Sequence, residues 1–153
     1  MNPRTRDKGA KQPLETRVFV ALLKAADALN QEAEQVVKSQ GLTGAQYNVL
    51  RILRGAEPEG LPCRGISERM ISHDPDMTRL LDRMEKRGMI SRERQTDDRR
   101  VVKTRITEKG LEILEKLDQP VRELHREQLR HASQARLKEL ERLLEEVAAG
   151  APK

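Results

Sequence analysis

The stretch that decides the fold of this chain is residues 78–110, which reads TRLLDRMEKRGMISRERQTDDRRVVKTRITEKG. Its first part has the spacing of an amphipathic helix, with Leu80, Leu81 and Met84 on one face. Two short stretches with partial alternation follow, and the polar residues 95–100 separate them, which predicts a β-hairpin with a long loop. A basic helix fits the major groove of DNA, and an arginine-tipped hairpin can reach the neighbouring minor groove. The order of these elements therefore indicates a DNA-binding segment.

The charge of the chain is concentrated in the same segment. The 153 residues carry a net charge of +5, and residues 79–105 hold ten Lys or Arg against five Asp or Glu. The basic and acidic residues outside this segment balance, so the segment contains the whole positive excess. Localised positive charge is typical of proteins that bind a polyanion, because phosphate contacts release counterions. The alternative is a solvated basic surface, which the adjoining hairpin disfavours.

The composition favours helices and an intracellular location. The chain has one Phe, one Tyr and no Trp, and 36% of its residues are charged, which indicates a mainly α protein with an aliphatic core. Residues 1–13 are charged and contain no apolar run, so we expect neither a signal peptide nor a membrane anchor there. We expect them to be a disordered basic arm. The lone Cys63 cannot form an intrachain disulfide, which fits a cytoplasmic protein.

Long amphipathic helices are predicted at both ends of the chain. Apolar residues recur every three or four positions over residues 14–40, which at 1.5 Å per residue would give a helix about 40 Å long. Thr107 should cap a second long region, residues 108–149, which has the same spacing. Pro120 should kink or divide the first part of this region. These two regions carry more apolar surface than one small domain can cover.

Shorter helices are predicted between the two ends. Thr43 should cap a helix that ends at Gly55, and residues 63–70 should form the next one. Asp74 followed by a proline predicts the start of a third helix, over residues 75–87. Two short helices, a brief turn and an immediate hairpin describe a winged helix-turn-helix.

With this set of elements, the chain resembles the MarR family of bacterial transcriptional regulators over nearly its whole length. The most specific match is the family's wing signature, which stands here as Asp98-Arg-Arg100 followed by Ile106-Thr-Glu-Lys-Gly110, with Ile106 in place of leucine. Residues 78–88 also fit the family's recognition helix. The fold class implied is mainly α, a winged helix-turn-helix with long N- and C-terminal dimerisation helices.

The resemblance also implies a domain organisation and a mode of action. Residues 14–150 would form a single MarR-like domain, with dimerisation helices at 14–40 and 108–149 and a DNA-binding lobe at 42–107. A homodimer would present two recognition helices to successive major grooves of double-stranded DNA, so the operator would be a pseudo-palindrome. We expect a repressor that a small-molecule effector modulates.

Ten residues are expected to contact DNA. They are Asp76, Thr78, Arg79, Arg83, Arg92, Arg94, Asp98, Arg99, Arg100 and Lys103. Thr78 and Arg79 near the start of the recognition helix should meet base edges, with Asp76 accepting from a cytosine or orienting Arg79. By resemblance Arg100 would enter the minor groove, held by Asp98.

The other basic residues of the segment have less specific expected roles. Arg83, one turn further along the helix, could meet a base or a phosphate. Arg92, Arg94, Arg99 and Lys103 should be phosphate contacts, which fix register without reading sequence.

The sequence gives weaker evidence for an effector site and for a redox site. The family's effector cleft would involve Asn30, Tyr47, Arg51 and the helix after Gly110, although Tyr47 could equally be a core residue. We name no effector-binding residue. A redox role for Cys63 is left open.

No catalytic, metal or cofactor site is expected. Cys63 and His73 are separated by a predicted helix, which does not suit a nucleophile and its base, and His125 and His131 would lie on different helical faces. The alternative function is a winged-helix module that binds a protein through its hairpin instead of specific DNA.

Overall fold

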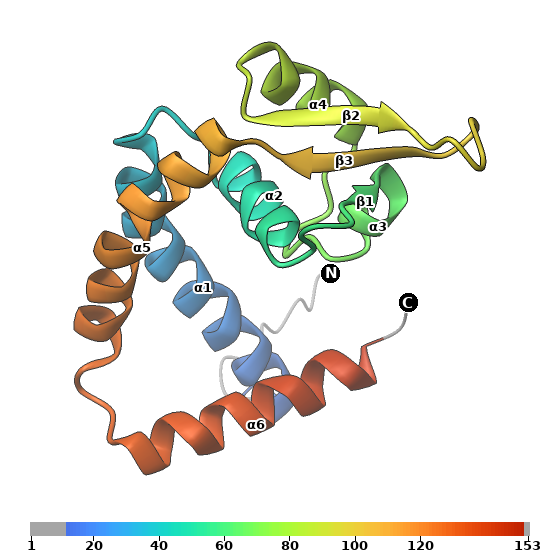
Figure 1. The fold of residues 1–153 in the computed structure, drawn as a ribbon. Coiled ribbons are helices and arrows are strands. Elements are labelled where there is room, and N and C mark those ends of the chain that lie inside the picture. Colours follow the sequence, from blue (N-terminus) through green and yellow to red (C-terminus); the bar gives the residue numbers. More distant parts are fainter. Residues whose placement is uncertain (1–11, 152–153) are drawn as a thin grey trace, which may run out of the picture.

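The computed structural model describes residues 12–151, so the predicted basic arm lies almost wholly outside the described residues. The elements in order are α1 (Leu14–Lys38), α2 (Gly44–Arg54), β1 (Leu61–Pro62), α3 (Cys63–Ser67), α4 (Met77–Lys86), β2 (Ile90–Arg94), β3 (Val102–Ile106), α5 (Glu108–Leu129) and α6 (Gln134–Gly150). This order confirms the mainly α fold with a winged helix-turn-helix. Most of the chain is helical, and a small sheet lies with α2, α3 and α4 at one end of the molecule, away from α6 (Figure 1).

Two helix starts follow the predicted capping chemistry. The Thr43 hydroxyl accepts a hydrogen bond from the Gln46 amide at 3.2 Å, and the Gln46 side chain accepts from the Thr43 amide at 3.0 Å. This reciprocal pair is a capping box, which satisfies two amide groups that a helix start leaves unpaired. The Thr107 hydroxyl likewise accepts from the Gly110 amide at 3.2 Å and starts α5. The sequence therefore places the starts of α2 and α5 correctly.

The start of α4 was predicted wrongly. The helix begins at Met77 instead of Pro75, and Asp76, not Asp74, is its cap residue: an Asp76 carboxylate oxygen accepts from the Arg79 amide at 3.2 Å. Asp74 instead accepts from the Asp76 amide at 2.8 Å, two residues on, which stabilises the turn before the helix. Asp74 and Asp76 are both suited to cap a helix, and the local sequence does not show which of them is the cap residue.

One further prediction needs correction, and one of the two outcomes predicted for Pro120 is ruled out. The helix expected over residues 63–70 is shorter, because α3 ends at Ser67 and the chain continues as a turn. Pro120 does not divide its helix: α5 is continuous through it, although it changes direction along its length (Figure 1). A proline removes one backbone hydrogen bond, and in a helix of this length the flanking turns and the packing of α1 and α2 on α5 maintain the rest.

The sheet contains a strand that the sequence did not predict. Its order is β1-β3-β2, and both pairings are antiparallel. β1 lies between two predicted helices, where no strand was expected, and two residues are too few to show an alternating pattern. Gly60 makes the pairing possible, since its φ is +67° and a Cβ there would lie 2.5 Å from the Thr104 carbonyl oxygen.

The core lies between α2, α4, the wing strands and the first half of α5. It consists of Val37, Leu42, Val49, Leu50, Leu53, Ile66, Met77, Leu80, Leu81, Met84, Met89, Ile90, Ile106, Leu114, Leu117 and Val121. Only Val37 comes from α1, and α6 contributes no buried residue. None of the helices in residues 12–151 is both long and apolar enough to cross a membrane.

Candidate nucleic-acid interface

The helix α4 has one buried face and one exposed face. Met77, Leu80, Leu81 and Met84 are buried at the spacing of one helical stripe, as predicted. The exposed face carries the predicted contacts Thr78, Arg79 and Arg83. Because the apolar stripe fixes the rotation of the helix about its axis, the exposed face is presented outward from the lobe. In Figure 1, α4 lies at the edge of the molecule, next to β2.

Asp76 holds Arg79 at the start of this helix. One carboxylate oxygen of Asp76 caps the Arg79 amide, and the other forms an ion pair with the Arg79 Nε at 3.2 Å. The Arg79 side chain is still 80% exposed, so its remaining guanidinium nitrogens are free to donate. Of the two roles predicted for Asp76, the geometry supports the orientation of Arg79 over direct contact with a base.

The wing extends away from the rest of the molecule and has a second pair of this kind at its tip (Figure 1). One Asp98 carboxylate oxygen accepts from the Arg100 amide at 3.0 Å and from the Arg100 Nε at 3.2 Å. The Arg100 side chain is 93% exposed. The expected hold of Asp98 on Arg100 is therefore present, with the arginine directed toward solvent.

The basic residues of the segment fall into two groups. Arg83, Arg94, Arg99 and Lys103 form no recorded ion pair within residues 12–151, and only Lys103 is partly buried. Arg87 and Arg105 instead hold the lobe together. Arg87 donates to the Gly41 carbonyl at 2.9 Å, and Arg105 lies 3.6 Å from Glu93 across the wing strands. A count of charges cannot separate these two groups.

Arg92 belongs to the second group, although the sequence predicted a phosphate contact. Its Nη2 lies 2.6 Å from an Asp82 oxygen and 2.5 Å from a Glu85 oxygen, and its Nε donates to Glu85 at 2.9 Å. These hydrogen bonds, the one to Glu85 foremost, raise the pKa of the Arg92 guanidinium above its usual value. A phosphate would have to compete with two carboxylates for this side chain.

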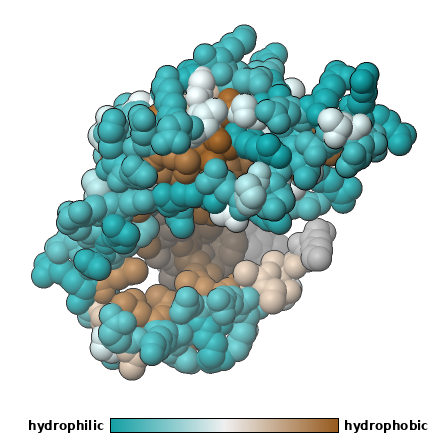
Figure 2. Space-filling view, in the orientation of Figure 1, coloured by the Kyte–Doolittle hydropathy of each residue, from teal (hydrophilic) through white to brown (hydrophobic). Residues whose placement is uncertain are grey.

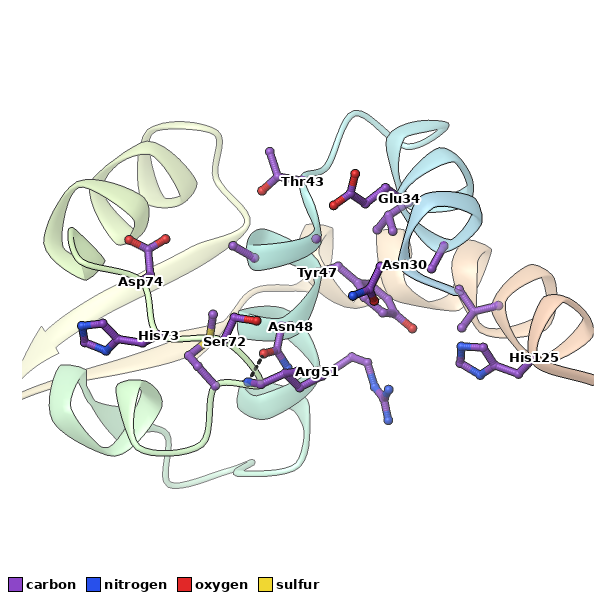
Figure 3. Close-up of a pocket in the computed structure, with 17 residues that line it drawn as sticks. Asn30, Glu34, Thr43, Tyr47, Asn48, Arg51, Ser72, His73, Asp74 and His125 are labelled. Carbon is purple, nitrogen blue, oxygen red and sulfur yellow. Dashed lines mark hydrogen bonds between the residues drawn. The ribbon is translucent and has the colours of Figure 1, made fainter. Parts of the chain in front are cut away.

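A cavity of about 500 Å³ lies between the lobe and the helices beneath it. Figure 3 shows Asn30 of α1, Tyr47 and Arg51 of α2, and His125 of α5 around it. These are the elements from which the effector cleft was expected. Tyr47 lines the cavity and also packs against the core. The Arg51 guanidinium carbon lies 5.9 Å from the Tyr47 ring centroid, a cation–π contact at the mouth of the cavity.

One wall of the cavity was missed by the sequence analysis. It is the turn before α4, residues 70–74, and the Ile71 amide in this turn donates to the Asn48 side-chain oxygen at 2.8 Å (Figure 3). Asn48 lies on α2 within the cavity lining, so a single side chain joins the cavity to the segment that leads into α4. A hydrogen bond across 23 residues has no signature in a linear sequence.

An ion pair connects the lobe to α5 below it. Arg54 at the end of α2 donates to both oxygens of Asp118, at 2.8 and 2.9 Å. This bidentate hydrogen bond lowers the pKa of the Asp118 carboxyl and raises that of Arg54. The pair fixes the end of α2 against the middle of α5.

The remaining candidate groups form no chemical site in the described part of the chain. Cys63 is exposed at the start of α3. His125 lines the cavity described above, whereas His131 lies in a second hollow, beyond the end of α5. Among residues 12–151, no three His, Cys, Asp or Glu side chains are close enough together to hold a metal ion.

Comparison with known proteins places this geometry in a family. Residues 42–102 match the model of the MarR family. A solved MarR transcription factor from Planctomyces limnophilus is 37% identical, covers 89% of this chain and 98% of its own, and superposes with a TM-score of 0.67. The homoprotocatechuate degradative operon repressor of Escherichia coli is 28% identical over 85% of this chain and 86% of its own length.

A third relative was solved with a ligand. The PcaV transcriptional regulator from Streptomyces coelicolor, in complex with its natural ligand, is 25% identical, covers 94% of this chain and all of its own, and has a TM-score of 0.73. All three relatives are described as regulators of transcription, not as enzymes. The match in the lobe, the 37% identity over nearly a whole relative and the observed winged helix-turn-helix lead to one conclusion: this chain belongs to the MarR family of transcriptional regulators.

Proposed function

We propose that this regulator is a homodimeric, sequence-specific DNA-binding repressor that a small molecule releases from a pseudo-palindromic operator. The observation that carries the proposal is the division of α4 into a buried apolar face and an exposed face with Thr78, Arg79 and Arg83. The wing tip presents Arg100 from the same lobe, so a helix and a hairpin are available to two adjacent grooves.

The side chains have different proposed roles. Arg79 is the main reader of base edges, because a guanidinium can donate two hydrogen bonds to guanine, and Asp76 restricts its rotation. Arg100 enters the minor groove while Asp98 holds it. Four further basic residues contact bases or phosphates, and they are Arg83, Arg94, Arg99 and Lys103.

The dimer is proposed from the apolar surface of the terminal helices. Large apolar side chains stay exposed along both α1 and α6, among them Phe19, Leu23, Leu140 and Val147. Figure 2 shows hydrophobic residues gathered on the side of α6 that faces the rest of the molecule. Apolar surface of this extent is typical of an interface. A second copy is the occupant that fits, since two-fold pairing would also set the spacing of two α4 helices.

The ranges of the two parts follow from this arrangement. Residues 14–40 and 108–149 are proposed as dimerisation helices, and residues 42–107 as the DNA-binding lobe, within a single domain over 14–150. The first part of α5 also contributes Leu114 and Leu117 to the core of the lobe. Movement of the dimer helices would therefore be transmitted to the lobe through packed side chains.

The cavity is the proposed site of the effector. Its volume of about 500 Å³ falls in the range of small-molecule sites, and its lining combines Arg51, Tyr47 and two histidines with apolar walls. This chemistry suits a small anionic or aromatic molecule. Release from DNA would follow if the molecule displaced the turn that Asn48 holds.

The experiment that tests the proposal is a binding titration of the full-length protein with duplexes from the region upstream of its own gene. We expect one duplex to bind at a low protein concentration, with protection of two half-sites about one helical turn apart. Sedimentation of the free protein should give a dimer. A failure to bind any duplex at low salt would refute the proposal and favour a module that binds proteins through the wing.

A further inference from the structure

Apart from the apolar core that α4 shares with the base of the wing, few polar contacts join the two elements. Gly88, with a φ of +72°, turns the chain from α4 into β2. The Thr107 hydroxyl and the Lys109 ammonium donate to the carbonyls of Gly88 and Arg87, at 2.6 and 2.7 Å. These contacts fix the base of the wing against α5. They act at one end of β2, where the buried Ile90 also lies, and beyond this end the strand is held by its pairing with β3.

Arg92 supplies the link further along the strand. Asp82 and Glu85 are three residues apart on α4, so both carboxylates lie on the helix face that packs against β2. The Arg92 guanidinium contacts both of them, at 2.6 and 2.5 Å, and its side chain is only 26% exposed. A planar guanidinium held by two carboxylates has a fixed position, which a single flexible ion pair would not give it.

Recognition by two elements depends on their relative geometry. The distance and angle between adjacent major and minor grooves are properties of DNA, so α4 and the wing can engage together only in one relative orientation. We propose that Arg92 is a positioning residue that fixes the orientation of the wing relative to α4 through Asp82 and Glu85. This inference rests on the proposed DNA-binding function and assigns Arg92 a role other than phosphate contact.

The two roles predict opposite effects when the carboxylates are neutralised. Asp82→Asn combined with Glu85→Gln removes two negative charges near the DNA surface and keeps the size of both side chains. If Arg92 is a phosphate contact, the change frees its guanidinium, and binding to every duplex should tighten. If Arg92 positions the wing, binding to the operator should weaken about fivefold despite the added positive charge.

A matched control measures the effect of charge alone. Asp97 lies exposed in the wing loop, and within residues 12–151 it has no recorded ion pair. Asp97→Asn should bind the operator as tightly as the wild type or more so.

Arg92→Lys is the conservative variant: a lysine replaces a phosphate contact well, but it cannot reproduce the fork that spans two carboxylates. Positioning therefore predicts weaker binding for Arg92→Lys, too.

The decisive measurement is the loss of operator binding that Arg100→Ala causes, made both in the wild type and in the Asp82→Asn, Glu85→Gln double variant. In the wild type, Arg100→Ala should weaken operator binding about tenfold, the effect of a lost groove contact. In the Asp82→Asn, Glu85→Gln background the same change should weaken binding less than twofold, because the wing is no longer held in its groove. A lobe that is merely less stable would show the same tenfold loss in both backgrounds when assayed well below its melting temperature.

The outcomes separate this inference from the proposed function. If the wild-type protein binds no duplex, the proposed function fails before any variant is compared. If the wild type binds and the Arg100→Ala loss is equal in both backgrounds, or the double variant binds more tightly than Asp97→Asn, the positioning role is overturned and the proposed function stands.

Discussion

The helices α4 and α6 carry the same kind of sequence pattern but end in opposite environments. In α4 the apolar residues are all buried, and Met84 is completely inaccessible to solvent. In α6 the apolar residues recur at the same helical spacing, yet Leu144 is 41% exposed and Val147 is 56% exposed. An amphipathic stripe therefore specifies a helix and a face. It does not specify whether the surface that covers this face belongs to the same chain.

This difference shows which part of the molecule buries its apolar surface within a single chain. The lobe contains most of the core and all of the α4 stripe, and a sheet residue, Thr104, is also fully buried there. The terminal helices leave apolar surface exposed to water, which costs about 25 cal/mol of free energy per Å². Association with a second copy would remove this cost. We therefore expect disruption of α6 to change the assembly, and disruption of α4 and the wing to change recognition.

The largest effect should come from charging the exposed face of α6. Leu140→Glu combined with Leu144→Glu should convert the dimer to a monomer and weaken operator binding by more than about 100-fold, because two linked half-sites become one. Analytical ultracentrifugation and a binding titration measure the two effects. Lys138→Glu places the same side chain on the opposite face of α6 and should leave both unchanged. A double variant that stays dimeric would show that the interface lies elsewhere.

The next effect compares a proposed base contact on α4 with a proposed phosphate contact on the wing. Arg79→Ala should cost about 1 to 3 kcal/mol on the operator and relax base preference at one position in each half-site. Lys103→Ala should weaken all sequences alike and reduce the salt dependence of binding by about one counterion. Titration against a set of single-base operator variants, at several salt concentrations, separates these results. Wild-type binding by both variants would show that this surface does not contact DNA.

A smaller effect is expected at the connection between the cavity and α4. Asn48→Ala removes the acceptor for the Ile71 amide and should weaken operator binding about fivefold, the equivalent of one net hydrogen bond of about 1 kcal/mol. Asn48→Asp keeps an oxygen acceptor and should retain more of the affinity. Hydrogen exchange of residues 70–74 should become faster in Asn48→Ala. Unchanged exchange in this turn would show that Asn48 does not hold it.

The smallest effect concerns the ion pair between the lobe and α5. Asp118→Asn should lower the free energy of unfolding at pH 7 by about 0.5 to 1 kcal/mol, as expected for a partly exposed pair. The pKa of Asp118 is lower in the folded protein, so the pair stabilises the fold above the ordinary pKa of 3.8 and is lost as the pH falls through the folded value. Urea unfolding should thus distinguish variant and wild type at pH 7 and show no difference in strong acid.

A second acidic residue provides the control for this pH dependence. Arg142 also lowers the pKa of Glu139, but this pair lies fully in solvent on α6. Glu139→Gln should have no measurable effect on unfolding at either pH. An equal effect of the two variants would show that the position of Asp118 between α2 and α5 is unimportant.

Much of the fold could be predicted because its signals are local. Helix caps at Thr43 and Thr107, the apolar stripe of α4 and the position of the hairpin each depend on residues within a few positions of one another. The errors arose where two local signals competed or a signal was too short. Asp74 and Asp76 both suit a helix start, and β1 has only two residues.

The candidate site divides in the same way. The pairs Asp76–Arg79 and Asp98–Arg100 lie two or three residues apart, so the sequence could suggest them. Two other contacts depend on how the elements pack, and neither was predicted. They are the ion pairs of Arg92 with Asp82 and Glu85 and the hydrogen bond from the Ile71 amide to Asn48. Equally basic residues in a sequence thus become either exposed contacts or internal links.

The sequence by itself determined that this protein has a basic helix and an arginine-tipped hairpin between long amphipathic ends, because helical periodicity, capping and turn chemistry act over short distances. Within residues 12–151, three features emerge only when the elements pack together: which arginines form no ion pair, which arginine contacts α4 from the wing, and the cavity beside the turn that leads into α4. These features depend on which faces meet in space, and the burial of one face against another is not encoded at any single position.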